Sequence, residues 1–98
     1  MKARTYISGP MTGILDFNFP EFKAKAAELR ALGCDVVNPM EHGEDECTEW
    51  ADFLRKDIRL LVDCNAIHML PGWTNSKGAR LEHHIAVQLG FTVTGAER

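Results

Sequence analysis

The stretch IHMLPGWTNSKGARLE, residues 67–82, decides the fold because it combines a strand, a loop and the start of a helix. Residues 65–70 have the pattern of a short buried strand, and Pro71-Gly72 ends it. Asn75 or Ser76 can cap the helix that follows. Loops after the C-terminal ends of parallel strands are where open α/β sheets bind ligands, so this stretch also predicts where a site lies.

Glu82 has an unexpected position on this helix, which is expected to extend to about Leu89. It lies three residues after Ala79, close to the stripe that Ile85 and Leu89 are expected to bury. A carboxylate beside an apolar stripe needs a physical reason, and a ligand would supply one. The alternative is that Glu82 reaches solvent at the edge of the stripe.

Size and composition describe one ordinary globular domain. The 98 residues are 45% hydrophobic and 26% charged, with a net charge of -3. Because no basic run offers a surface for duplex DNA or RNA, no nucleic-acid partner is expected. No apolar segment approaches the roughly 20 residues of a membrane span, and no signal core precedes the first strand. We therefore expect a cytoplasmic protein without a membrane partner.

The three cysteines, Cys34, Cys47 and Cys64, are odd in number and widely spaced. This pattern argues against a disulfide framework, fits a reducing compartment, and suggests that the thiols act as small buried hydrophobic groups. The four histidines show no metal-ligand spacing with the cysteines. Neither a metal site nor a cofactor is predicted.

The rest of the chain alternates strand and helix patterns. Thr5–Ser8 is β-prone, and the loop that follows it is rich in glycine. A helix is expected from about Phe19 to Leu32, with Asn18 as its cap and Gly33 as its C-terminal stop.

Two further strands and one further helix complete the pattern. Asp35–Asn38 is predicted to be a strand, Thr48 is expected to cap a helix that ends near Val62, and Phe91–Thr94 is predicted to be the last strand. The order β-α-β-α-β-α-β predicts a single α/β domain over residues 1–98. We expect a three-layer Rossmann or flavodoxin-like arrangement, with a four- or five-stranded parallel sheet and three main helices on its two faces.

Asp57 is the second acid in an apolar setting. Its neighbours three and four positions away are Phe53, Leu54, Leu60 and Leu61. If the helices of Asp57 and Glu82 flank one strand, the two carboxylates can meet above its C-terminal end, where a dry pocket would separate their protonation. Such a pair can cleave a glycosidic bond, one carboxylate attacking the anomeric carbon while the other assists the leaving group or orients the substrate.

Two loops are candidates for ligand binding. Ser8-Gly9-Pro10-Met11-Thr12-Gly13 can bring backbone amides close to a sugar or phosphate, although it lacks a dinucleotide or Walker spacing and a plain turn is the alternative. Ser76 and Gly78 begin a helix whose free amides suit a phosphate, and a simple helix cap is the alternative. We expect residues 8–13 and 72–78 to form two walls of one pocket.

Three aromatic residues lie near these loops. Trp73 and Trp50 could stack on a base, although Trp50 fits the core better. Tyr6 faces one side of the first strand, where core packing with a satisfied hydroxyl is the simpler interpretation.

The residues from Tyr6 to Gly13, and again from Asp57 to Glu82, resemble the nucleoside 2-deoxyribosyltransferase-like superfamily. The likeness is closest to its short phage- and prophage-associated branch and covers nearly the whole chain. It rests on a tyrosine strand followed by a glycine loop, an aspartate about 25 residues before a glutamate, and a serine six residues before that glutamate. The resemblance implies that Glu82 is the nucleophile of a covalent glycosyl intermediate.

The resemblance also implies roles for four other residues. Asp57 would position the substrate and assist the leaving group, and Tyr6 would orient the nucleophile. Ser76 would bind a substrate phosphate, and Gly9 would belong to the loop beside the sugar. One departure is Asn65, which stands where many relatives have an aspartate at the start of the third strand.

The sequence therefore predicts an N-glycosidase or deoxyribosyltransferase that acts on nucleosides or nucleoside 5′-monophosphates. The expected catalytic residues are Glu82, Asp57 and Tyr6. The expected substrate-binding residues are Ser8, Gly9, Pro10, Met11, Gly13, Trp73, Ser76 and Gly78. The alternatives are a non-catalytic nucleotide-binding module and a phage-encoded interaction protein that keeps the same pocket. A homodimer or higher homo-oligomer is expected, because the core is small and the superfamily builds sites between subunits.

Overall fold

The computed structural model describes residues 4–11, 15–41 and 49–96. Strands and helices alternate along the chain: β1 (Arg4–Ser8), α1 (Phe19–Ala31), β2 (Asp35–Val37), α2 (Trp50–Val62), β3 (Ala66–Met69), α3 (Lys77–Gln88) and β4 (Thr92–Gly95). Short 3-10 turns lie before α1, after β2 and before α3: Leu15–Asn18, Pro39–Glu41 and Trp73–Asn75.

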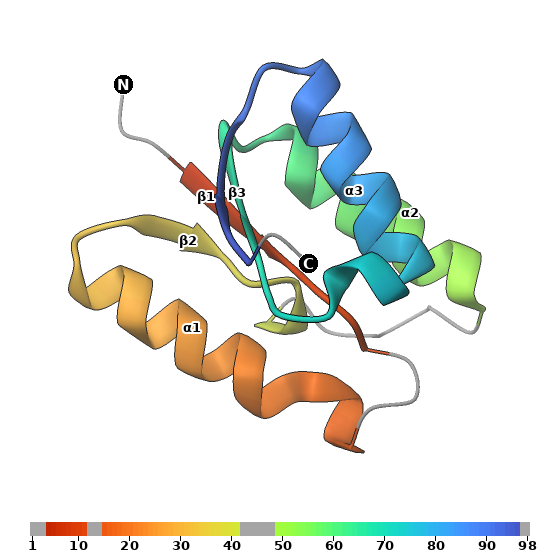
Figure 1. Cartoon of the computed structure of the whole chain (residues 1–98), viewed down its shortest axis with the longest axis horizontal. Coiled ribbons are helices and arrows are strands. Elements are labelled where there is room, and N and C mark those ends of the chain that lie inside the picture. The colour runs from red at the N-terminus through yellow and green to blue at the C-terminus, as the bar shows by residue number, and fades with distance from the viewer. Residues whose placement is uncertain (1–3, 12–14, 42–48, 97–98) are drawn as a thin grey trace.

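The four strands form one parallel sheet in the order β2-β1-β3-β4 (Figure 1). Between β1 and β3, Tyr6 pairs with Ile67 and Ser8 pairs with Met69. The predicted α/β domain is confirmed, with four strands in the sheet. β1 and β3 are the two central strands. Because they pair in parallel, their C-terminal ends lie next to each other.

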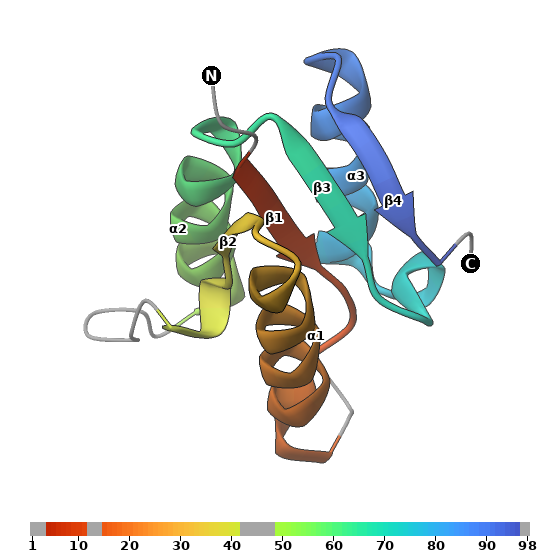
Figure 2. The ribbon, with the colours of Figure 1, turned by 90° about the vertical axis from the view of Figure 1, so that its left-hand side faces the viewer.

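The helices form the two outer layers of the sandwich. α1 packs on β1 and β2, whereas α2 and α3 pack against each other on the opposite face (Figure 2). Alternation along β1 divides its side chains between these layers. Ile7 joins the core cluster of α1, and Tyr6 joins the cluster that contains Leu61 of α2 and Ala86 of α3. Within the described ranges, none of the helices has the length and hydrophobicity needed to cross a bilayer.

The caps of the helices differ in part from the prediction. Asn18 occupies the N-cap position of α1 with a φ of 66°, but its side chain makes no capping hydrogen bond. Its Nδ2 instead donates to the carbonyl of Pro10 at 2.9 Å. Before α3 the cap is Ser76 rather than Asn75, and its Oγ accepts the amide of Ala79 at 3.2 Å. Thr48, the cap predicted for α2, lies outside the described residues.

The described cysteines are free thiols. Cys64 is buried and Cys34 is half-buried, while Cys47 lies outside the described residues. Burial raises the pKa of Cys64 to about 11, so this thiol stays protonated at neutral pH. It packs in the core as the sequence suggested.

Candidate active site

Glu82 belongs to the buried face of α3. It is 5% exposed, and its neighbours on that face, Ala79 and Ala86, are buried as well. Leu89, which the sequence placed in the buried stripe, is 55% exposed. The two small alanines let α3 approach the sheet closely, so the longer glutamate side chain reaches inward. The alternative in which Glu82 points to solvent is wrong.

Two hydroxyl groups from β1 hold the Glu82 carboxylate. Tyr6 donates to Oε2 at 2.7 Å, and Ser8 donates to Oε1 at 2.6 Å. Residues 6 and 8 point to the same face of the strand because side chains alternate along it. Tyr6 is therefore a core residue whose hydroxyl is satisfied by the candidate nucleophile. Core packing and a hydrogen bond to Glu82 are compatible at this position.

The electrostatic environment of Glu82 has opposing parts. Burial raises the pKa of Glu82 to about 7, hydrogen bonds from Ser8 and Tyr6 act to lower it, and the charge of Asp57 raises it. Burial also raises the pKa of Tyr6, with the carboxylates of Glu82 and Asp57 adding to the effect. Tyr6 consequently stays protonated and donates a hydrogen bond throughout the neutral range.

Asp57 approaches the same space from α2. Burial raises the pKa of its carboxyl to about 6, and the Lys56 ammonium acts in the opposite direction. Unlike Glu82, Asp57 receives no hydrogen bond from the described residues. The two acids therefore differ. Glu82 is buried and accepts hydrogen bonds from two hydroxyl groups, whereas the carboxylate of Asp57 is half-buried and accepts none from the described residues.

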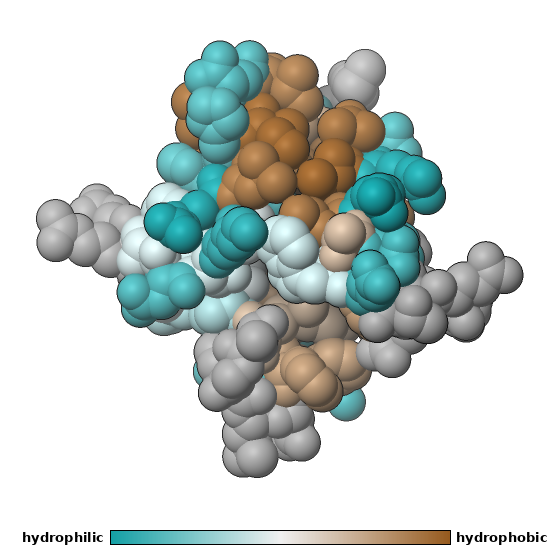
Figure 3. Space-filling model, turned by 90° about the vertical axis from the view of Figure 1, so that its right-hand side faces the viewer, coloured by the Kyte–Doolittle hydropathy of each residue, from teal (hydrophilic) through white to brown (hydrophobic). Residues whose placement is uncertain are grey.

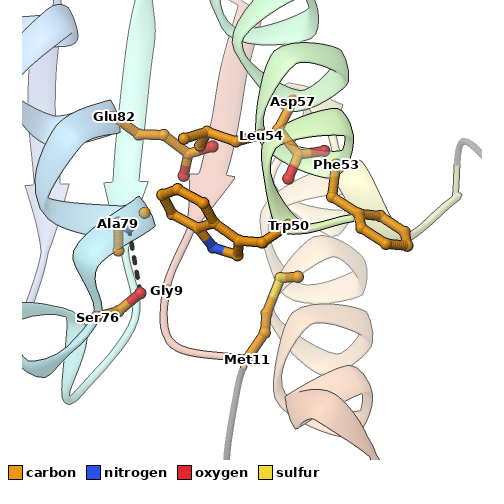
Figure 4. Close-up of a pocket in the computed structure, with 10 residues that line it drawn as sticks. Gly9, Met11, Trp50, Phe53, Leu54, Asp57, Ser76, Ala79 and Glu82 are labelled. Carbon is orange, nitrogen blue, oxygen red and sulfur yellow. Dashed lines mark hydrogen bonds between the residues drawn. The ribbon is translucent and has the colours of Figure 1, made fainter. Parts of the chain in front are cut away.

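A pocket joins the two acids to both predicted loops. Asp57 and Glu82 lie on opposite walls of it (Figure 4). The loop residues that line it are Gly9 and Met11 after β1, and Ser76 and Gly78 at the start of α3. The prediction that these loops share one pocket is confirmed for the described residues. Its volume of about 60 Å³ is small against the roughly 300–1,000 Å³ of pockets that enclose a whole ligand.

Trp50 lines this pocket, although the sequence favoured it as a core residue. It is 47% exposed in the first turn of α2, and the Lys77 Nζ lies 4.9 Å from its ring centroid. Phe53 and Leu54 line the same wall. They lie four and three residues before Asp57, so helical spacing from that acid was the signal that could have identified them.

Three of the described residues expected to bind substrate do not line the pocket. Ser8 is buried beneath the pocket and bound to Glu82, and Pro10 is buried with its carbonyl bound to Asn18. Trp73 stacks on the ring of His83 at 4.4 Å, and its indole N–H donates to the carbonyl of residue 96 at 2.8 Å. Gly13 lies outside the described residues.

The two glycines of the pocket differ in whether the surrounding atoms leave room for a side chain. A Cβ on Gly9 would lie 2.7 Å from the Cβ of Leu70, so packing alone requires glycine there. A Cβ on Gly78 would be 3.7 Å from the nearest atom of Leu54, which is an ordinary contact. Gly9 is thus required by packing against Leu70 and also forms part of the pocket wall.

Asn65 lies away from the pocket. The Oδ1 of Asn65 accepts the amide of Arg4 at 2.7 Å, at the N-terminal end of the sheet and away from the pocket. The departure at this position therefore does not alter the pocket. Among residues 4–11, 15–41 and 49–96, no three His, Cys, Asp or Glu side chains gather in a group that could hold a metal ion.

Residues 3–95 match the model of a family described as a domain of unknown function, DUF4406. Comparison with curated proteins gave no match.

Proposed function

The chain belongs to the DUF4406 family, and we propose that it cleaves the N-glycosidic bond of a nucleoside or nucleoside 5′-monophosphate. One observation carries the proposal: two desolvated carboxyl groups, Glu82 and Asp57, line one pocket from two helices. Their surroundings are unequal, since among the described residues hydroxyl groups bond to the Glu82 carboxylate and not to that of Asp57. Such inequality suits one group for nucleophilic attack and the other for proton transfer.

In the proposed reaction, a carboxylate oxygen of Glu82 attacks the anomeric carbon while the bond from that carbon to the base nitrogen breaks. The bonding electrons leave with the base, to which Asp57 gives a proton. Water then attacks the anomeric carbon, returns a proton to the Asp57 carboxylate and releases Glu82. In a transferase, the nitrogen of a second base replaces water in this step.

The hydrogen bonds and the burial of the two acids support this division of roles. The donors Tyr6 and Ser8 stabilise the charged form of Glu82, which the nucleophile requires. Asp57 is half-buried, so a bound substrate would remove more of its water and raise its pKa further. Glu82 is already 5% exposed and has little hydration left to lose. Binding therefore favours an ionised Glu82 beside a protonated Asp57.

The pocket walls suggest how a nucleotide would lie. First-turn amides of α3, near Ser76 and Gly78, suit a phosphate because they and the helix dipole are positive. Trp50 offers a half-exposed ring for stacking on a base. Because the cavity is small, the sugar would lie between the acids and the base would extend toward the rim beside Trp50.

The resemblance to the nucleoside 2-deoxyribosyltransferase-like superfamily supports the reaction class, because it assigns the same roles to Glu82 and Asp57. The competing reading is a nucleotide-binding module, or a phage-encoded interaction protein, that keeps the pocket without catalysis. The two readings differ in one measurable respect, which is the release of free base.

We also propose that copies of the chain self-associate through the outer surface of α2 and α3. Hydrophobic residues gather over these helices on one side of the molecule (Figure 3). Their exposed large apolar residues include Val62 on α2 and Leu81 on α3, at 50% and 39%. Burying such surface against a second copy would add to the stability of a small core.

The decisive experiment is incubation with a panel of ribo- and deoxyribonucleosides and their 5′-monophosphates, followed by chromatography of free base. We expect release by the wild type and a loss of about 10³-fold in Glu82→Gln, which keeps the shape of the side chain but is a poor nucleophile. Glu28→Gln, on the exposed side of α1, is the matched control and should act like wild type. Wild type that binds nucleotides without releasing base would support the binding module. Equal release by Glu82→Gln would refute the nucleophile assignment.

A further inference from the structure

Each oxygen of the Glu82 carboxylate has its own hydroxyl donor. Ser8 donates to Oε1 at 2.6 Å and Tyr6 donates to Oε2 at 2.7 Å. Both donors lie on one strand, with a single residue between them, and both are at most 1% exposed. The carboxylate is therefore held at two points by a rigid element, which fixes the rotation of its plane.

Ser8 is placed to act on Glu82 rather than on a ligand. It does not line the pocket, where its strand and the following loop contribute Gly9 and Met11. Its carbonyl accepts the amide of Leu70 at 2.8 Å, which fixes the backbone between β1 and the loop after β3. A Cβ at Gly9 would clash with Leu70, so this loop packs too tightly for Ser8 to turn outward without moving the chain.

We propose that Ser8 is a positioning residue that, together with Tyr6, aims a lone pair of the Glu82 carboxylate into the pocket. The inference rests on the proposed function, in which Glu82 is the nucleophile. A carboxylate oxygen has two lone pairs, and each hydroxyl occupies only one on its oxygen. The remaining lone pairs stay available for attack, while the orientation of the group is set before substrate arrives.

Removing the Ser8 hydroxyl would leave Oε1 buried with one donor fewer. The charged form of Glu82 would lose stabilisation, so its pKa should rise. In the part of the chain that the structure describes, Tyr6 of β1 and Asp57 of α2 are the ionisable groups that face Glu82 from the elements packed against it. Neither is altered by Ser8→Ala, so a change in the pKa of Glu82 would report the missing hydroxyl.

The test measures the pKa of Glu82 directly, by NMR titration of protein with ¹³C-labelled glutamate carboxyl groups and without ligand. We expect Ser8→Ala to raise it by about one unit, since hydrogen bonds to charged groups have about that effect. Ser8→Cys, with a weaker donor of similar size, should give a smaller rise and serves if Ser8→Ala does not fold. Thr94→Val removes a hydroxyl on β4, which bonds His68, and should leave the pKa of Glu82 unchanged.

Base release gives the second readout. At pH 7, Ser8→Ala should lower kcat by about tenfold or more while KM changes little, because Ser8 touches no substrate. Restoring a hydroxyl with Ser8→Thr should recover part of kcat. A folded Ser8→Ala protein with the wild-type pKa at Glu82 would overturn the proposal, as would a change confined to KM.

The titration also separates this inference from the function on which it rests. If Ser8→Ala raises the pKa of Glu82 but wild type releases no base, the hydrogen bond orients a carboxylate as stated and only the proposed function fails. If wild type releases base and Ser8→Ala leaves both the pKa and kcat unchanged, the function stands and the role of Ser8 is refuted.

Discussion

At the scale of single residues, Glu82 shows how a functional candidate can oppose stability. Burial makes its charged form less favourable in the folded protein than in the unfolded chain, and the hydroxyls of Ser8 and Tyr6 offset only part of that effect. A side chain chosen for stability alone at this position would be apolar. Its presence between the buried Ala79 and Ala86 is consistent with a chemical task.

The first prediction concerns the pH dependence of stability. The pKa of Glu82 rises from 4.5 to about 7 on folding, so between these values the folded state binds more protons than the unfolded state. The free energy of unfolding should therefore fall as pH rises through this window, by about 3 kcal/mol in total. Glu82→Gln should lose less stability than wild type between pH 5 and pH 8. Urea unfolding at pH 5 and pH 8 checks this. The same change in the free energy of unfolding between the two pH values in both proteins would contradict it.

The second prediction concerns catalysis and pH. The proposed reaction needs Glu82 ionised and Asp57 protonated, while their pKa values in the ligand-free protein are about 7 and about 6. Only a minor fraction has this distribution, and it is greatest between the two values. We expect a narrow bell-shaped profile of kcat/KM with its maximum between pH 6 and pH 7. Asp57→Asn should be slower and lack the alkaline limb. A wild-type profile that is flat from pH 5 to pH 9 would exclude the two-acid mechanism.

At the scale of elements, local sequence signals predicted the fold well. Glycine and proline punctuation separated the strands and helices, and the cap at Ser76 was among the alternatives considered. Contacts between distant segments could not be derived in this way. The hydroxyl of Ser8 meets a carboxylate 74 residues later, and the indole of Trp73 finds the carbonyl of residue 96. Such contacts depend on how strands pair, which residue patterns alone do not specify.

The site was predictable to the extent that its acids were out of place in the pattern. Glu82 and Asp57 stood out because charged residues rarely occupy apolar helix faces. On α3 only Leu89 was misread: it is exposed, whereas Ile85 packs against the core and the small Ala79 and Ala86 are buried. Close helix packing favoured small side chains over the more hydrophobic ones.

The third prediction compares two glycines of the pocket. Gly9→Ala should destabilise the fold by about 1–3 kcal/mol, because its Cβ would overlap with Leu70 between two packed strands. Gly78→Ala should be neutral or stabilise by up to about 1 kcal/mol, since alanine favours a helix and its Cβ has room. Thermal or urea unfolding of the two variants measures the difference. Equal destabilisation would show that the loop after β1 is not tightly packed.

At the scale of the whole molecule, the surface of α2 and α3 that we propose for self-association includes a residue of the pocket. Trp50 lines the pocket and is also among the exposed large apolar residues. A second copy bound to this surface would lie close to the pocket rim. Assembly and substrate binding would then influence each other.

The fourth prediction tests that assembly. Light scattering at tens of micromolar should report a dimer or larger species for wild type. Leu81→Glu should shift the equilibrium toward monomer, because burying a carboxylate in the interface without an opposite charge beside it is unfavourable. Arg80→Glu, at the neighbouring exposed position, is the control and should leave the assembly unchanged. A wild type that is monomeric at these concentrations would refute self-association.

The residues that hold Glu82 belong to a central strand, whereas Asp57 belongs to a helix with little buried surface, and this difference should be visible in amide hydrogen exchange. Ser8 and Tyr6 belong to a central strand, whereas α2, which carries Asp57 and Trp50, buries only Leu61 completely. Amides of residues 6–8 should exchange only when the whole domain unfolds, and those of residues 53–58 should exchange through local opening. Exchange mass spectrometry would distinguish the two regimes, and equal protection would mean that the pocket opens as one unit. With unequal protection, substrate could enter by transient loosening of α2 while the nucleophile stays in register with the sheet.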